Sequence, residues 1–449
     1  MRAVVSVGAR TILSSPSYTP VLPLAPVLGL LLALALLPQV HAQTPADTTA
    51  APAEVATEVV TEAADAVVRR RVRPIVSPAA LYSGSRGFGV GGGVAVSNLA
   101  RPGDHLQVEG RVSQRLQSAF GAYMTGEPEI APLFGLIGGA VMTTSRYPFF
   151  GTGPHADPDG RLDLERSEWE VEGRIGWSPF GTDAVLLQPT VRYRADRLRD
   201  YAPADSGALA FVSAEDLAAL DALRDDARSG VSVGLSAITD TRNNKARPAR
   251  GAYLQGSAAR FFSTDGSGLK FNRFETTGYL FRPAPFRLPF QPERGAVFVR
   301  VAGVVVREDG VDSGLPILYY PVFDRDLLMG WPVRSFVGQD ALSVGVGSRG
   351  VVVNRIGAFR VEGTALALLG AAYNDVFREF SPRVSLSSDP VGVGENVPLR
   401  PSFGVGINLH YRDRERPLVG GLIGIGPGGI TTTSFRLVVG LDRYRPEIR

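Results

Sequence analysis

Apolar and polar residues alternate along most of the chain after Pro74, and this period of two residues constrains the fold more than any other feature. The pattern is clearest in residues 106–113, 169–177 and 403–412, where one face is apolar and the other carries charged or polar residues or glycine. Successive side chains of a β-strand point to opposite faces, so this spacing is typical of strands. Its repetition predicts an all-β, antiparallel fold.

The apolar face of these segments carries aromatic residues near the strand ends, among them Trp169, Trp177, Phe403 and Tyr411. In a soluble β-sandwich the apolar faces pack against each other and the polar faces meet water. In a transmembrane β-barrel the apolar face meets lipid between aromatic girdles, and the polar face lines the lumen. The aromatic placement favours a transmembrane barrel of the outer-membrane type.

The strand count predicts a sixteen-stranded barrel over residues 74–449. The predicted strands are 75–82, 87–98, 105–114, 118–126, 133–145, 165–178, 184–196, 230–240, 251–263, 268–282, 295–307, 341–353, 357–370, 401–412, 417–425 and 432–443. An even number returns both ends of the barrel to the periplasm. The long connections 146–164, 197–229, 308–340 and 371–400 then lie outside the cell, and the short turns 99–104, 179–183, 354–356 and 413–416 lie inside.

Residues 1–42 have the features of a secretory signal peptide. Arg2 and Arg10 are followed by an apolar stretch, and Val40-His41-Ala42 is a small-x-small cleavage site. A membrane anchor is the alternative, but the apolar core 27–37 is shorter than the about 20 residues that a spanning helix needs. Residues 43–73 are rich in Ala, Thr and Glu and predict a flexible periplasmic linker, with a transient helix as the alternative.

The remaining composition gives no support for an enzyme. The chain has 0 Cys, which excludes disulfides and thiol chemistry, and a net charge of +3 gives no reason to expect nucleic acid. The sequence Gly230-x-Ser232-x-Gly234 lies inside a predicted strand rather than at a nucleophile elbow. The acidic residues Asp157, Asp159 and Asp163 fit a solvated loop better than an extracellular cation site. We therefore predict no catalytic, cofactor-binding or metal-binding residues.

The long predicted connection 308–340 contains many large apolar groups, namely Tyr319, Tyr320, Phe323, Trp331 and Phe336. Loops of more than about 15 residues in compact folds are usually functional or disordered. Such an aromatic content is unusual for a solvated tether. We therefore predict that this loop folds back into the mouth of the barrel. In the connection 197–229, Ser213 and Asp216 form a capping box before three leucines and predict a short helix.

Four stretches, residues 73–83, 147–153, 240–251 and 330–349, resemble the BamA/TamA family of outer-membrane proteins, the bacterial surface antigen barrels of the outer-membrane assembly factor superfamily. The resemblance identifies a lumen-loop motif and a turn motif. The loop motif with its lumenal partners comprises Gly330, Trp331, Arg334, Phe336, Asp340, Arg349 and Glu362. The turn motif comprises Asp240, Arg242, Asn244, Pro248 and Gly251.

The chain departs from this family pattern at three places. Met329 replaces the arginine at the tip of the loop, and Gly347 replaces a glutamate of the following strand. These two family residues are thought to form an ion pair inside the barrel. The linker 43–73 is also too short to hold the periplasmic repeat domains of the family's assembly factors.

The resemblance implies an integral protein of the cell outer membrane that takes part in membrane-protein insertion or secretion. A passive or gated pore and a structural surface-binding barrel are the alternatives. The expected partners are outer-membrane lipid and either nascent outer-membrane proteins or other envelope factors. We expect the barrel to be monomeric.

Glu362 is expected to face the lumen, because Arg360, Glu362 and Thr364 share one face of their predicted strand. A carboxylate in a narrow lumen is costly unless it is paired. With Met329 unable to pair, we predict that Glu362 pairs with Arg334 or Arg349. Arg334 would then hold the loop in the barrel, with Trp331 and Phe336 packed beside it. The alternative is that Glu362 faces lumenal water.

Overall fold

The computed structural model describes residues 73–83, 87–99, 104–125, 133–157, 159–179, 185–224, 227–244, 247–285, 287, 294–309, 316–321, 337–387, 391–392, 395–411, 418–426 and 429–438. The predicted signal peptide 1–42 lies outside these residues, as does the linker 43–73 except for Arg73, which begins the first strand.

Seventeen strands account for most of the described chain. They are β1 (Arg73–Ser83), β2 (Gly87–Ser97), β3 (His105–Ser113), β4 (Leu116–Thr125), β5 (Leu133–Phe149), β6 (Leu162–Trp177), β7 (Val185–Pro203), β8 (Ala227–Asp240), β9 (Gly251–Ser263), β10 (Lys270–Pro283), β11 (Ala296–Glu308), β12 (Asp340–Ile356), β13 (Phe359–Tyr373), β14 (Phe380–Val384), β15 (Val397–Tyr411), β16 (Val419–Gly426) and β17 (Gly429–Val438).

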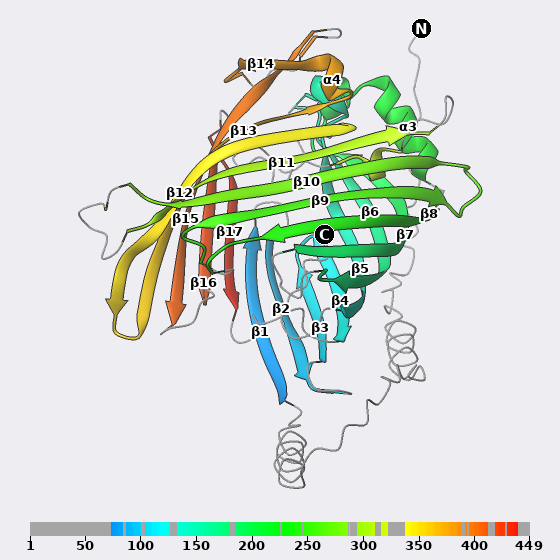
Figure 1. Cartoon of the computed structure of the whole chain (residues 1–449). Coiled ribbons are helices and arrows are strands. Elements are labelled where there is room, and N and C mark those ends of the chain that lie inside the picture. The colour runs from blue at the N-terminus through cyan, green and yellow to red at the C-terminus, as the bar shows by residue number, and fades with distance from the viewer. Residues whose placement is uncertain are drawn as a thin grey trace, which may run out of the picture. The chain divides into compact units, whose positions relative to one another are not determined.

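The sheet is a single antiparallel meander whose ends meet (Figure 1). Each strand pairs with its sequence neighbour, except that β13 pairs with β15, and the short β14 lies parallel to β15. Among the described residues, β1 pairs with β17 along Ala79–Ser83 and with β2 along its whole length. Removing β14 from the seventeen strands leaves the predicted sixteen in the barrel wall. The predicted fold class is confirmed.

Most predicted strand positions agree with the observed ones, and the differences lie at the ends. The strands β5, β6 and β7 extend beyond their predicted ends on the side of the long loops. The last hairpin is tighter than predicted, because only residues 427 and 428 separate β16 from β17. The prediction also missed β14 and a one-turn helix before it, because an isolated short strand has no alternation to detect.

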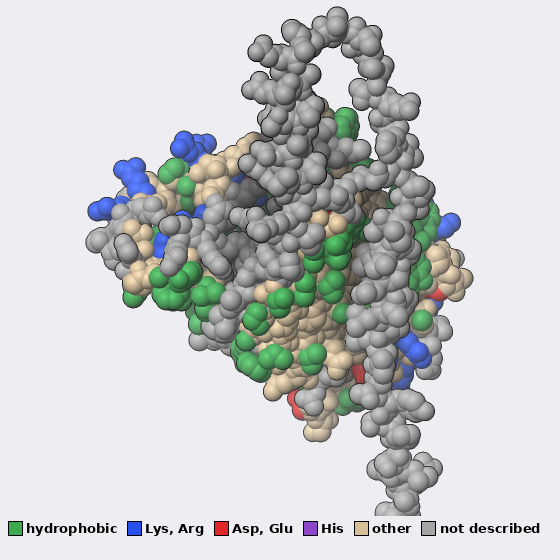
Figure 2. Space-filling view, turned by 90° about the horizontal axis from the view of Figure 1, so that it is seen from below, with side chains coloured by type: hydrophobic (Ala, Val, Ile, Leu, Met, Phe, Trp, Pro, Cys, Tyr) green, Lys and Arg blue, Asp and Glu red, His purple; other side chains and the backbone are tan. Residues whose placement is uncertain are grey.

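The outward face of the wall is apolar. Its exposed side chains include Val112, Trp169, Ile175, Trp177, Val191, Leu235, Leu254, Val299, Val346, Phe403, Val405 and Ile407. Neighbouring strands present these residues to the same side, since Val299 pairs with both Leu280 and Val346. Figure 2 shows hydrophobic side chains over the visible wall, with Lys and Arg nearer its edges. This arrangement suits lipid outside and polar groups inside, as the alternation predicted.

The helical elements all belong to the long connections. They are η1 (Gly153–His155), η2 (Ala208–Phe211), α3 (Ala214–Arg224), η3 (Ile317–Tyr319) and α4 (Val376–Glu379). The backbone N–H of Asp216 donates to the Ser213 hydroxyl at 3.0 Å, which confirms the predicted start of α3. Within the described ranges, no helix has the length and apolar character needed to span a membrane.

Candidate functional site: a lumen with inward-folded segments at both ends

Two charge networks line the inner face of β6 and β7. In the first, buried Asp196 accepts from Arg166 Nε at 2.9 Å and also pairs with Arg194, and Glu168 joins both arginines. In the second network, Glu172 pairs with Arg174 and Arg192, the latter through Nε at 2.6 Å. A buried charge is tolerated only when it is paired and hydrogen-bonded, and both buried carboxylates meet this condition.

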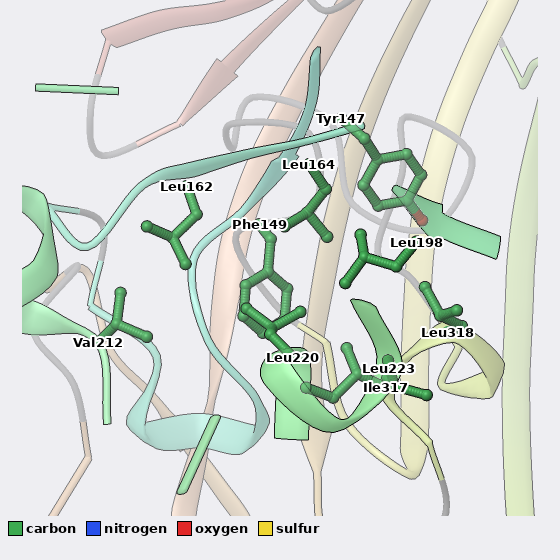
Figure 3. Close-up of a cluster of buried hydrophobic side chains, with 10 residues drawn as sticks. All are labelled: Tyr147, Phe149, Leu162, Leu164, Leu198, Val212, Leu220, Leu223, Ile317 and Leu318. Atoms are coloured by element: carbon green, nitrogen blue, oxygen red, sulfur yellow. The ribbon is translucent and has the colours of Figure 1, made fainter. Parts of the chain in front are cut away.

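An apolar cluster fills the mouth of the barrel on the side of the long loops (Figure 3). It combines residues from β5, β6, β7, the segment between η2 and α3, α3 itself and the loop after β11, namely Tyr147, Phe149, Leu162, Leu164, Leu198, Val212, Leu220, Leu223, Ile317 and Leu318. Burial of such a set stabilises the arrangement by removing apolar area from water. Parts of three of the connections that were predicted to be extracellular, 146–164, 197–229 and 308–340, therefore form a packed plug.

The segment 316–321 of the connection 308–340 reaches into the lumen below this cluster. The Tyr319 ring packs on Phe261 and Phe271, with centroids 4.9 and 5.5 Å apart. Arg194 donates to the Leu318 carbonyl and Arg273 to the Tyr319 carbonyl, each at 3.4 Å. Burial raises the pKa of the Tyr319 phenol, so it stays neutral at physiological pH. For these residues the predicted inward fold of the loop is observed.

Hydrogen bonds fix the stretch 147–153 to helix α3 within this plug. The Thr152 hydroxyl and backbone N–H both donate to the Asp216 carboxylate, the hydroxyl at 2.6 Å. Gly153 has a φ of 73° and its N–H donates to the Val337 carbonyl. A left-handed backbone favours glycine, which explains this residue at the point where the chain turns toward Val337.

The turn motif between β8 and β9 is held by its own side chains. Both Asp240 oxygens accept from Arg242, at 2.7 and 2.6 Å. The Asn243 amide oxygen accepts from two backbone N–H groups, those of Ala249 and Arg250, at 2.9 and 3.0 Å. The Asn244 oxygen accepts from the Arg247 N–H at 2.6 Å. Asx residues commonly replace backbone partners in this way, so the turn has one defined conformation.

The same turn is anchored to strands on another part of the wall. Arg247 Nε lies 3.3 Å from Glu362 Oε2 on β13, and Arg349 on β12 donates to the Pro248 carbonyl at 2.7 Å. His410 Nε2 of β15 lies 3.2 Å from the same Glu362 oxygen. Since β10 and β11 separate β9 from β12 in the sheet, these contacts carry the turn across the lumen.

The Glu362 side chain is buried, and cationic side chains lie close to its carboxylate, as a buried charge requires. Arg349 Nε lies 3.9 Å from Glu362 Oε1, so the predicted pairing with Arg349 is observed, at a long distance. The closer partner is Arg247, which the sequence analysis did not consider. Arg247 is not one of the residues of the turn motif, and no pattern in one sequence links it to a strand more than a hundred residues away.

The position of Gly347 explains why the family's glutamate is absent there. A side chain at Gly347 would meet the Phe298 ring. Phe298 packs with Phe281 at a centroid distance of 5.5 Å. Aromatic side chains therefore occupy the space that a side chain at position 347 would need.

A cavity of about 860 Å³ lies between the two inward-folded segments. Tyr319 lines it at one end, and Arg242, Pro248 and Arg349 line it at the other. Arginine and glutamate side chains of β6 and β7 form one wall. The cavity is thus a lumenal chamber with Tyr319 at one end and residues of both predicted motifs at the other.

Asp340 lies outside this chamber. It pairs with Tyr373 and Val305 in the sheet, on the outward side. Its buried carboxylate accepts from Arg307 at 2.6 and 2.8 Å and from the Val376 N–H at 2.8 Å. Asp340 thus holds the ends of β11 and β12 to the start of α4. The other loop-motif residues, Gly330, Trp331, Arg334 and Phe336, lie outside the described residues, and the predicted role of Arg334 stays a prediction.

The other sequence motifs have ordinary structural roles. Gly230, Ser232 and Gly234 lie within β8, so Ser232 does not sit on a strand-to-helix turn. Asp163 pairs with Arg161 at 2.8 Å, and Asp157 accepts from the Asp159 N–H. Within the described ranges, no group of three or more His, Asp and Glu residues is arranged to hold a metal ion.

No protein-family model matches the chain, and a search of curated proteins finds no match. Among solved structures, BamA from Haemophilus ducreyi lacking POTRA domains 1–3 is similar with a TM-score of 0.56 and 12% identity, over 83% of this chain and 71% of that chain.

Two CdiB structures are similar at lower scores. CdiB from Acinetobacter baumannii has a TM-score of 0.46 and 12% identity, over 82% of this chain and 60% of that one. CdiB from Escherichia coli has a TM-score of 0.49 and 9% identity, over 81% of this chain and 62% of that one. The chain therefore spans less than two thirds of either CdiB. By its strand order, its apolar outward face and its likeness to BamA, the chain has the fold of a BamA-type outer-membrane β-barrel.

Proposed function

We propose that the protein assists the insertion or secretion of other outer-membrane proteins, and that it does so at the junction between β1 and β17. The observation that carries this proposal is the character of the strands at the junction. β2 and β16 contain no charged residue and are rich in glycine, and β1 and β17 contain no acidic residue. Glycine weakens a strand interior, because it adds no side chain to pack.

The two inward-folded segments also support a lateral route. An unfolded client that passed through the barrel would have to displace both the plug at one end and the Arg247-anchored turn at the other. At the junction a strand of the client would pair with β1 or β17 in place of their pairing with each other, because an opened edge strand presents unpaired N–H and C=O groups. Nascent outer-membrane proteins are therefore the proposed partners.

The test is a reversible cross-link across the junction. The chain has 0 Cys, so new disulfides form in a clean background. Ala80 pairs with Leu437, and antiparallel partners have Cα spacings of about 4.5–5.5 Å, within disulfide range. The pair Ala80→Cys and Leu437→Cys is compared with Val299→Cys and Val346→Cys, which join β11 to β12.

The readout is the folding rate of an unfolded small outer-membrane barrel added to vesicles that hold the protein. We expect the parent to accelerate folding, the junction disulfide to abolish the acceleration, and a reductant to restore it. The β11–β12 disulfide should have no effect. Equal activity of the oxidised junction variant and the parent would refute the lateral route.

A gated pore is the second candidate, and the chamber of about 860 Å³ with its arginine and glutamate wall is the observation that favours it. Single-channel recording in planar bilayers separates the two. If the protein assists insertion, the parent protein should show few channel openings. If it is a pore, the parent protein should conduct ions readily without any substitution.

A further inference from the structure

The first part of the connection between β13 and β15 folds over the outward side of the barrel, and further along the connection the Val391 N–H donates to the Pro154 carbonyl of η1 at 3.1 Å. Ala371, Tyr373 and Val397 form a buried cluster on that outward side, with Val376 of α4 packed against it. Sheet pairing shows on which side Ala371 lies. Val301 is exposed on the outward face and pairs with Val344, which pairs with Leu369. Ala371 is two residues from Leu369 on the same strand, so it points to the same side. The cluster therefore lies on the lipid side of the wall, at its loop end. We call residues 375–387, which cover it, the outer flap.

The outer flap exposes large apolar side chains. Phe377 is 81% exposed and Leu386 is 72% exposed, while Val384 and Phe380 are 54% and 42% exposed. Contiguous exposed apolar groups on a folded surface mark an interaction site with a protein, a ligand or a membrane. The cost of leaving such groups in water suggests that another molecule covers them.

The flap descends from the loop end toward the lipid-facing part of the wall. β14 runs parallel to β15, with Phe380 opposite Val397 and Val384 opposite Leu399. Phe403, on the outward face of β15, follows four residues after Leu399, about 14 Å along a tilted strand. The apolar side chains of the flap therefore lie beyond the loop-side border of the lipid-facing surface, and the buried Leu399 and Pro401 lie between them and Phe403.

Two arginines accompany these apolar groups. Arg378 is 87% exposed, and its Nε lies 3.4 Å from Asp375. Arg383 is exposed and has no acidic partner among the residues that the structure describes. The nearby Glu379 is occupied, because its carboxylate accepts from the Asn374 and Asp375 N–H groups. A surface with apolar groups and arginines at a membrane border fits an anionic headgroup above acyl chains.

We propose that the outer flap binds phosphorylated lipid of the outer leaflet, with Phe377, Val384 and Leu386 among the acyl chains and Arg378 and Arg383 at the phosphates. The position of the flap at the border of the lipid-facing wall, with arginines beside its apolar groups, favours lipid over a protein partner. The flap would hold the β12, β13 and β15 part of the wall in the membrane. This inference does not depend on what crosses the junction.

The test is native mass spectrometry of the full protein in detergent, titrated with lipid A or with phosphatidylcholine, whose headgroup has no net charge. The charge variant is Arg378→Gln with Arg383→Gln, and the apolar variant is Phe377→Ser with Leu386→Ser. The matched controls are Arg224→Gln and Phe211→Ser, which alter exposed residues of α3 and η2. Heat-modifiable migration in gels establishes that each variant is folded.

Each arginine near an anionic membrane surface contributes about 1 kcal/mol. We therefore expect the charge variant to bind lipid A at least about tenfold more weakly, with binding of phosphatidylcholine unchanged. The apolar variant should bind both lipids more weakly, and the controls should match the parent. Equal lipid A binding by parent and charge variant would overturn the proposal. So would a parent dimer that the apolar variant converts to monomer, because the flap would then be a protein interface.

Discussion

The wall formed by β6 and β7 and the wall around the β1–β17 junction are built differently. β6 has 16 residues and β7 has 19, whereas β16 has 8 and β17 has 10 in the described chain. Ion pairs centred on Asp196 and Glu172 cross between β6 and β7. β2 and β16 carry no charged residue with which to form such pairs.

This difference indicates how one sheet can be both rigid and able to open. Backbone hydrogen bonds are present in both walls, so they do not distinguish them. The side chains do, because cross-strand pairs each contribute about 0.2–1 kcal/mol and glycine contributes none. Local opening occurs where the stabilising contacts are fewest. We therefore place the opening at the junction and the anchor at β6 and β7.

The largest effect should come from breaking the anchor. Asp196→Ala leaves Arg166 buried without its main partner. Removing one member of a buried pair costs about 3–5 kcal/mol of unfolding free energy. Val94→Ala on β2, which is exposed to lipid, should cost no more than about 1 kcal/mol. Urea unfolding from lipid vesicles measures both, and similar losses for the two variants would remove the contrast between the walls.

A smaller effect should follow from releasing the lumenal turn. Arg247→Ala removes the close arginine from Glu362, and a hydrogen bond to a charged group contributes about 1.5–3 kcal/mol. We expect the turn to move out of the lumen, so that channel openings increase in planar bilayers. Arg250→Ala, on an exposed residue of the same turn, is the control. If both variants stay as closed as the parent, the turn does not close the chamber.

The glycine at the end of the anchored turn, Gly251, should contribute to the free energy of unfolding. Gly251 has a φ of 103°, and a Cβ there would meet the Thr241 carbonyl oxygen. Gly251→Ala should therefore cost about 1–3 kcal/mol through backbone strain. Unfolding in urea measures the loss, and an alanine tolerated without loss would show that the turn is free to adopt another conformation.

The smallest change in unfolding free energy is expected near the junction, and it should be a gain in stability rather than a loss. An added Cβ at Gly110 on β3 meets no atom within 4 Å. Gly110→Ala should stabilise the barrel by about 0.4–1 kcal/mol, because alanine reduces the entropy of the unfolded chain. The same urea assay detects this gain. A loss above about 1 kcal/mol would mean that this part of the wall is packed as tightly as the anchor.

The alternation of side chains was sufficient to predict the barrel, because lipid outside and water inside impose it on every strand. The closure of the lumen was predicted only in part. Tyr319 lay in a loop whose aromatic content indicated burial, and Glu362 lay on a polar strand face. The Arg247 contact and the flap at Phe377 could not be predicted, because each depends on where a connection folds relative to distant strands.

Amide hydrogen exchange of the protein in lipid nanodiscs tests the central claim most directly, since it reports local opening strand by strand. The account predicts that the amides of Ala79–Ser83 in β1 exchange much faster than those of Arg192–Asp196 in β7, although both segments are paired in the sheet. It also predicts that Asp196→Ala speeds exchange in β7, so that the exchange rates of the two segments become more similar. Equal protection of the two segments in the parent protein would contradict it.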